Sequence, residues 1–246
     1  MNLIGLHGFS GSKHDWGPFA EVLGRPIAGI DLVGHGKADA PVEINGYNTD
    51  AMLHCVLERL KQAGPVTLIG YSMGGRVALR FALRFPERMR ALVLIGAHPG
   101  LVDPVQRSER MARDFALAGR IEANGVDWFC DYWAEQPIIR SQKTIPAHIR
   151  EPMEQRKRQN RLAGSLRGFG QGAVDPVWDR LGELHMPALV ISGMADERYT
   201  GIAARMVSAM PDATHRVIPN AGHCAHLENL SESTREVDSF LGRISG

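Results

Sequence analysis

The sequence of 246 residues predicts an α/β fold with a mostly parallel sheet flanked by helices. Short runs rich in β-forming residues, apolar on both faces, recur along the chain, as in strands buried within a parallel sheet. Each run is followed by a turn and then by helix-like sequence, the alternation expected when helices connect parallel strands. The length favours one α/β unit with an inserted segment over two ordinary domains.

The predicted elements can be placed in order along the chain. The strand runs are LIGLHG, PIAGIDL, VTLIGYS, ALVLIGAH, ALVISGM and HRVIPNAG, which begin at Leu3, Pro26, Val66, Ala91, Ala188 and His215. Before the third strand, residues 49–64 carry apolar side chains at helical spacing. Gly64 and Pro65 are helix-stop signals, so we expect this helix to end there and lead into the strand.

The alternation stops after the fourth strand. No strand pattern occurs from residue 99 to residue 171, where helical stretches such as 108–125 and 150–170 dominate. We predict a core of residues 1–98 and 172–246 and a helical insertion of residues 99–171, called the lid below. The lid has 12 basic and 9 acidic residues, hence +3, and the remainder has 16 and 18, hence −2. Such an insertion is placed to cover the strand ends where these folds bind ligands, although a solvated helical face also fits its composition.

Composition and charge argue against several classes of partner. A net charge of +1, without a Lys-rich run, does not support binding to nucleic acid or to a membrane surface. No run is long enough to span a bilayer, and the N-terminal MNLIGLHGF lacks the features of a signal peptide. Cys55, Cys130 and Cys224 lie at unrelated spacings, which fits a reduced compartment. We therefore expect a cytoplasmic protein.

Ser72 lies in the G-x-S-x-G pentapeptide of the stretch GYSMGG, between a predicted strand and a predicted helix. In that context the motif indicates a nucleophile elbow, a sharp turn that exposes the serine hydroxyl at the top of the sheet. The flanking glycines allow the backbone to make this strained turn. We predict that Ser72 is the catalytic serine.

A catalytic serine needs an imidazole to take its proton and an acid to orient that imidazole. In this fold the chain order is serine, acid, histidine. Asp196 follows the strand ALVISG, and His223 follows the strand HRVIPNAG, so both fall where a triad requires them. Glu197 is an alternative acid, and His226 is more simply explained as a packing histidine.

The stretch LHGFSGS, residues 6–12, follows the first strand. A His-Gly pair at this place forms the loop whose backbone N–H meets the oxyanion, and the residue after the serine supplies the second donor. We predict that Phe9 and Met73 are these donors. His7 either contacts substrate or is a structural histidine that bonds backbone, and both readings stay open.

Neither a cofactor nor a metal is predicted. The chain contains no G-x-G-x-x-G and no G-x-x-x-x-G-K-[ST] motif. No histidine pair lies beside a carboxylate at metal-binding spacing on a helix. A cysteine nucleophile would be expected at the elbow, so Cys224 is interpreted as a structural thiol.

Together, the serine elbow, the HGF loop, the triad order and the helical lid resemble the α/β-hydrolase superfamily over almost the whole chain. Within it, GYSMGGRVAL, FCDYWAEQPI, QRKRQN, SLRGFGQG and AGHCAHLE resemble the 2-succinyl-6-hydroxy-2,4-cyclohexadiene-1-carboxylate synthases of menaquinone biosynthesis. This resemblance implies a cofactor-free lyase that eliminates pyruvate from 2-succinyl-5-enolpyruvyl-6-hydroxy-3-cyclohexene-1-carboxylate, with the triad as general base. The alternatives are a hydrolase of an ester or carbon–carbon bond in a small carboxylated substrate, and a ligand-binding receptor with a vestigial triad.

The same resemblance implies which residues contact the substrate. They are Tyr71, Arg76, Arg110, Trp133 and Arg156, with Arg158 or Arg161 as alternatives to the last. One helical turn after Ser72, a buried Arg76 guanidinium would need an anion, either a substrate carboxylate or a carboxylate of the core. For the lid arginines, a solvated surface position is the alternative.

The chain departs from the family pattern at three places. It begins directly at the HGF strand, without the antiparallel strands that often open this fold. The loop DLVGHGKA lacks a usual proline and serine, and His98 stands where serine is frequent. The expected ligand is a small polycarboxylate, and a monomer or weak homodimer is expected.

Overall fold

The computed structural model describes residues 2–158 and 160–244. Its centre is a six-stranded sheet in the order β2-β1-β3-β4-β5-β6, with every pairing parallel. The strands are β1 (Leu3–Leu6), β2 (Ile27–Ile30), β3 (Val66–Tyr71), β4 (Met89–Ile95), β5 (Ala188–Gly193) and β6 (Ala213–Ile218). Each lies within or overlaps one of the predicted runs, so the predicted fold class is confirmed.

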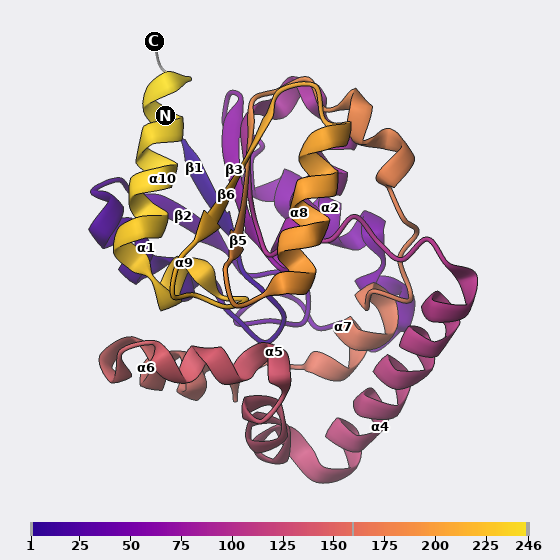
Figure 1. Cartoon of the computed structure of the whole chain (residues 1–246). Helices are drawn as coiled ribbons and strands as arrows, with labels where there is room; N and C mark the ends of the chain where they lie inside the picture. Colours follow the sequence, from indigo (N-terminus) through magenta and orange to yellow (C-terminus); the bar gives the residue numbers. More distant parts are fainter. Residues whose placement is uncertain (1, 159, 245–246) are drawn as a thin grey trace.

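Helices cover both faces of the sheet (Figure 1). One face carries α1 (Gly17–Leu23), α9 (Ala225–Glu228) and α10 (Leu230–Arg243), and the other carries α2 (Thr49–Arg59), α3 (Met73–Arg84) and α8 (Glu197–Ala209). The short 3-10 helices of the core are η1 (Lys13–Trp16), η2 (Ile44–Tyr47), η3 (Pro86–Arg88) and η5 (Trp178–Glu183). Adjacent residues Leu68 and Ile69 of β3 enter the two opposite core clusters, which is why the strand sequence is apolar throughout.

Helix α2 ends at Arg59, earlier than the stop signal at Gly64 predicted. The chain leaves the helix at Leu60, whose side chain is buried in the core. The Arg88 guanidinium donates hydrogen bonds to the carbonyls of Leu60 and Ala63. A side chain from η3 therefore satisfies carbonyls that a longer helix would have bonded internally.

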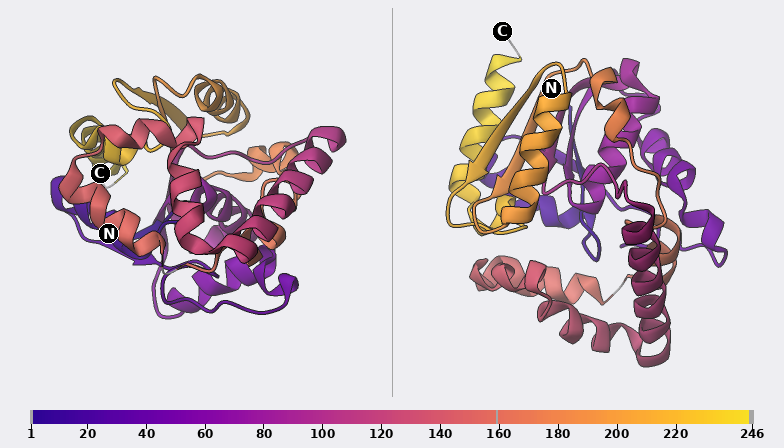
Figure 2. Two further views of the ribbon diagram at one scale, coloured as in Figure 1. Left: turned by 90° about the horizontal axis from the view of Figure 1, so that it is seen from below. Right: turned by 45° about the vertical axis from the view of Figure 1, so that its right-hand side comes forward.

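The lid forms α4 (Pro104–Ala134), α5 (Pro137–Arg140), η4 (Ser141–Thr144), α6 (Ala147–Lys157) and α7 (Leu162–Phe169). These elements lie as a layer below the core, on the side where the strands end (Figures 1 and 2). Within α4 the backbone of Gly125 is not helical, with φ 85° and ψ 171°, so the chain changes direction there. Across the described parts of the chain, no helix combines the length and apolarity needed to cross a membrane.

Candidate active site

The turn between β3 and α3 holds Ser72 in a strained backbone conformation, with φ 49° and ψ −106°. Its N–H donates to the carbonyl of Ile95 at 2.8 Å. A side chain at Gly70 would place its Cβ 2.6 Å from the carbonyl oxygen of Gly74, and one at Gly74 would lie 2.1 Å from that of Leu6. Only glycine fits at both positions, so the pentapeptide is required by the packing of the turn itself.

Three segments that are distant in sequence bring the predicted triad together. The His223 Nε2 lies 2.9 Å from the Ser72 hydroxyl oxygen, and its Nδ1 lies 2.7 Å from a carboxylate oxygen of Asp196. Asp196 is also the N-cap of α8, accepting from the Tyr199 N–H at 3.4 Å. The pairing is with Asp196 and not with the alternative acid Glu197, and the geometry is that of a serine whose proton can pass to histidine.

Glu228 holds the loop that carries His223. Its carboxylate accepts hydrogen bonds from the N–H groups of Gly222 at 2.6 Å and Cys224 at 3.0 Å, one on each side of the histidine. It also accepts from the Ser141 hydroxyl of the lid at 2.9 Å. Sequence reasoning missed this residue, although it stands in the HCAHLE stretch and its spacing from His223 is visible there.

Aromatic rings pack against the triad histidine and its neighbours. The Tyr199 ring meets His223 edge-on with centroids 4.4 Å apart. His226 packs between Trp16 and Tyr71, with ring centroids at 4.9 Å and 4.7 Å. Burial lowers the pKa of His226 to about 3, so it is uncharged at neutral pH. This environment fits a packing histidine.

A cavity of about 650 Å³ opens at Ser72 between the strand ends and the lid. Every sequence-predicted substrate contact lines it except Arg156, and both predicted oxyanion donors line it too. Met73 is the first residue of α3, so its N–H has no acceptor inside the helix. The N–H of Phe9 has no acceptor within hydrogen-bond distance among the described residues. Both N–H groups are therefore free to meet an oxyanion.

His7 lines the cavity, but its ring is already bonded to backbone. Nδ1 donates to the Gly8 carbonyl at 2.7 Å, and Nε2 accepts from the Leu32 N–H at 3.0 Å. Burial lowers the pKa of His7, which keeps the ring neutral and both bonds in place. The structural reading of His7 is thus favoured over a polar contact with substrate.

Arg76 is buried at the cavity wall, 7% exposed. One terminal nitrogen donates to the Phe169 carbonyl at 2.9 Å, and the guanidinium carbon lies 5.4 Å from the centre of the Phe169 ring. Its Nε has no partner among the described residues, and no carboxylate of those residues forms an ion pair with it. The core carboxylate considered as an alternative partner is therefore not found in residues 2–158 and 160–244.

Burial lowers the pKa of Arg76 to about 9; Tyr199 and the Asp114 carboxylate oppose this shift, and the nearby cations Arg80 and Arg110 add to it. The guanidinium still carries its charge at neutral pH, in a place where water solvates it poorly. An anion bound in the cavity would relieve this cost.

Arg110 and Trp133 both reach the cavity from α4. The Arg110 Nε bonds the Asp114 carboxylate at 2.9 Å, and the same guanidinium bonds Gln171. The Trp133 ring lies 5.4 Å from the ring of Phe9, centre to centre, so it packs directly over the HGF loop. Arg110 can contact a ligand only by sharing its guanidinium with these protein partners.

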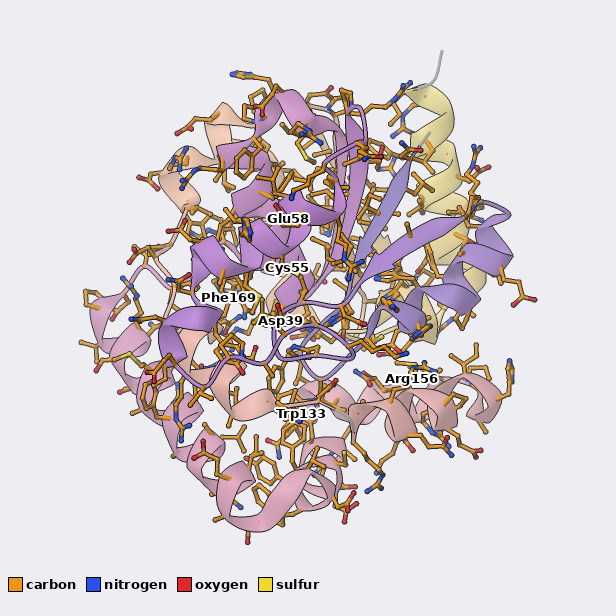
Figure 3. The ribbon with its side chains drawn as sticks, turned by 180° about the vertical axis from the view of Figure 1, so that it is seen from behind. Asp39, Cys55, Glu58, Trp133, Arg156 and Phe169 are labelled. Carbon is orange, nitrogen blue, oxygen red and sulfur yellow. The ribbon has the colours of Figure 1, made fainter. Side chains whose placement is uncertain are left out.

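Arg156 does not line the cavity. The geometry therefore does not support the direct substrate contact that the family resemblance implies for it. Its guanidinium bonds Asp15 at 2.8 Å instead. Arg158 bonds Asp127, and neither it nor Arg161 lines the cavity. Lys157 does, because successive helical residues point about 100° apart. Figure 3 shows Arg156 on α6, away from Trp133.

We found no group of three or more His, Cys, Asp or Glu side chains that could hold a metal ion, within the residues that the structure describes.

Comparison with known proteins agrees with this geometry. The family model of the α/β hydrolase fold matches residues 2–230. A Salmonella typhimurium (strain LT2) protein named 2-succinyl-6-hydroxy-2,4-cyclohexadiene-1-carboxylate synthase is 32% identical over 93% of this chain and 88% of its own length. A Bacillus subtilis (strain 168) protein, to which its name assigns the same activity provisionally, is 38% identical over 98% of this chain and 90% of its own. The chain belongs to this synthase family of α/β hydrolases.

Solved structures extend the likeness to the whole fold. MenH from S. aureus superposes with a TM-score of 0.94 at 28% identity, covering 100% of this chain and 95% of that one. A thermophilic esterase from Thermogutta terrifontis reaches 0.82 at 23% identity, covering 99% and 90%. The second likeness shows the fold alone.

Proposed function

We propose that this enzyme of the α/β hydrolase fold is a lyase. It would eliminate pyruvate from 2-succinyl-5-enolpyruvyl-6-hydroxy-3-cyclohexene-1-carboxylate to give 2-succinyl-6-hydroxy-2,4-cyclohexadiene-1-carboxylate. The names of its relatives support this reaction. The observation that carries the proposal is the buried Arg76, which lines the triad cavity and whose Nε has no hydrogen-bond partner among the described residues.

In the proposed mechanism, Ser72 acts as a general base and does not form an acyl intermediate. Its oxygen takes a proton from the substrate ring while its own proton passes to His223, whose charge Asp196 stabilises. The electrons of the broken C–H bond form a ring double bond, and the C–O bond to the enolpyruvyl group breaks. The leaving group takes a proton back from the imidazolium and becomes pyruvate. Protons and electrons balance in these steps without an oxidant or a cofactor.

The negative charge that develops on a substrate oxygen would be stabilised by the N–H groups of Phe9 and Met73. Arg76 would bind a substrate carboxylate through its guanidinium, whose planar fork of donors suits a carboxylate. Arg110 and Lys157 add positive charge to the same cavity. A neutral ester would leave the Arg76 nitrogen unpaired, which is why we favour an anionic substrate over the hydrolase alternative.

The test is pyruvate release from the enolpyruvyl substrate by the wild type, Ser72→Ala, Arg76→Met and Arg80→Met. Arg80 is the matched control, because it is a buried arginine on the same helix that does not line the cavity. Ser72→Ala should lose about 10³-fold or more in kcat. Arg76→Met should lose about 10²-fold in kcat/KM, the value of one charge-assisted bidentate contact, and Arg80→Met should retain activity where it remains folded.

Two results would contradict the lyase proposal. One is hydrolysis of a p-nitrophenyl ester with no release of pyruvate, which would indicate the hydrolase alternative. The other is tight binding of the substrate without turnover, which would indicate a receptor.

A further inference from the structure

The loop that carries the proposed Phe9 donor, residues 8–12, has an unfavourable backbone conformation. Ser10 has φ 65°, in the left-handed region that residues with a side chain seldom adopt. Ser10 is also buried, 2% exposed. A conformation of this kind persists only when the surrounding contacts hold it, and it is frequent at functional sites.

Two side chains hold the Ser10 peptide groups in place. The His35 Nε2 accepts from the Ser10 N–H at 3.2 Å. Asn160, from the lid, donates to the Ser10 carbonyl at 2.8 Å and to the Gly11 carbonyl at 3.2 Å. The Asn160 amide oxygen accepts from the Gly36 N–H at 2.8 Å, so both ends of the amide are used.

The neighbouring lid residue Arg156 holds the same loop by another route. It bonds Asp15, whose other carboxylate oxygen accepts from the Ser12 N–H at 2.8 Å. The lid therefore holds the loop directly through Asn160 and indirectly through Asp15. Asn160 is the direct contact: its side chain is buried, 6% exposed, and bonds the Ser10 and Gly11 carbonyls itself.

We propose that Asn160 is a positioning residue: it fixes the peptide groups after Phe9 so that the Phe9 N–H points into the cavity beside Ser72. The oxyanion hole then depends on the lid being in place, although neither donor belongs to the lid. The inference rests on the proposed use of Phe9 as an oxyanion donor, whether the reaction is elimination or hydrolysis.

The experiment measures kcat, KM and thermal unfolding for the wild type, Asn160→Ala, Asn160→Asp and Asn48→Ala. In Asn160→Ala we expect kcat to fall about 10- to 100-fold and KM to stay within about 3-fold, because a misaligned oxyanion donor weakens binding of the transition state only. Asn48→Ala is a control for loss of a hydrogen-bonding asparagine away from the site, since the Asn48 side chain caps α2 through the Ala51 N–H. It should keep kcat within about 2-fold of the wild-type value.

Asn160→Asp provides a second readout that does not depend on removing volume. The introduced carboxyl keeps the acceptor for the Gly36 N–H, but when ionised it faces the Ser10 and Gly11 carbonyls without a hydrogen to donate. Protonation restores one donor, so the ratio of variant to wild-type kcat should rise as pH falls from 8 to 5.5.

Three results would each overturn the inference. They are an unchanged kcat in Asn160→Ala, a loss of kcat in Asn48→Ala as large as that in Asn160→Ala, and a ratio of Asn160→Asp to wild-type kcat that does not vary with pH. If the wild type releases no pyruvate, the lyase proposal fails, and the same comparison is made on p-nitrophenyl acetate, whose hydrolysis uses the same oxyanion donors. The roles of Asn160 and of the lyase reaction are thus tested separately.

Discussion

At the scale of single residues, the position of His223 depends on a carboxylate that takes no part in the proton transfer. Glu228 bonds the backbone N–H groups on both sides of the histidine, whereas Asp196 bonds the ring itself. One acid therefore sets the tautomer and the other sets where the ring sits. Without Glu228, the N–H groups of Gly222 and Cys224 would be left unpaired beside the cavity.

Glu228→Ala should lower kcat about 10- to 100-fold with little change in KM, because it moves the base and not the binding groups. Ser141→Ala is the matched control, since it removes only the third hydrogen bond of the same carboxylate. Steady-state kinetics of both variants provide the measurement. Equal kinetics for the two variants would show that the loop keeps its shape without Glu228.

At the scale of elements, two glycines of α4 differ in backbone conformation, and we expect them to respond oppositely to substitution by alanine. Gly125 interrupts the helix with a positive φ of 85°, whereas Gly119 does not have a positive φ. A Cβ at either position would meet no atom within 4 Å. The difference between them therefore lies in the backbone alone.

Gly119→Ala should stabilise the protein by about 0.5 to 1 kcal/mol, because alanine is the better helix former. Gly125→Ala should destabilise it by about 1 to 2 kcal/mol, because alanine is strained at positive φ. Urea unfolding of the two variants beside the wild type measures both changes. Shifts of the same sign would mean that the break at Gly125 is not required.

At the scale of the whole molecule, buried neutral histidines link stability to pH. Burial lowers the pKa of His35 to about 3, of His98 to about 4 and of His226 to about 3. His35 and His98 each accept a hydrogen bond from a backbone N–H, which protonation would abolish. In the unfolded chain these rings would take up protons near the ordinary pKa of 6.5.

Because the unfolded state binds more protons below pH 6.5, stability should be constant above that pH and should fall as pH decreases toward 4. The loss is roughly 1.4 kcal/mol for each histidine at pH 5.5, or roughly 4 kcal/mol for the three. Unfolding by urea at pH 7.5, 6.5 and 5.5 tests this. His98→Ser should reduce the dependence of the unfolding free energy on pH, and the same change at the exposed His148 should leave that dependence unaltered. A flat profile from pH 7.5 to 5.5 would contradict the prediction.

The sequence by itself determined the strands, the serine elbow and the fold family. These features are encoded in short windows, where hydrophobic period and the steric demands of a turn decide the backbone. Gly70 and Gly74 illustrate this, since the approach of backbone to backbone at the elbow excludes any side chain. The identities of the triad residues followed because each stands directly after a strand, and parallel strands end on one side of a sheet.

Only the tertiary structure decided which distant side chains meet. Arg156 bonds Asp15, 141 residues earlier, and Asn160 bonds Ser10, 150 residues earlier. No local pattern in a helical lid specifies which of its basic residues faces the cavity, because neighbours such as Arg156 and Lys157 point about 100° apart and the sequence does not say how the helix is turned. Packing of the lid on the loop sets that rotation, and with it the division between residues that line the cavity and residues that hold it in shape.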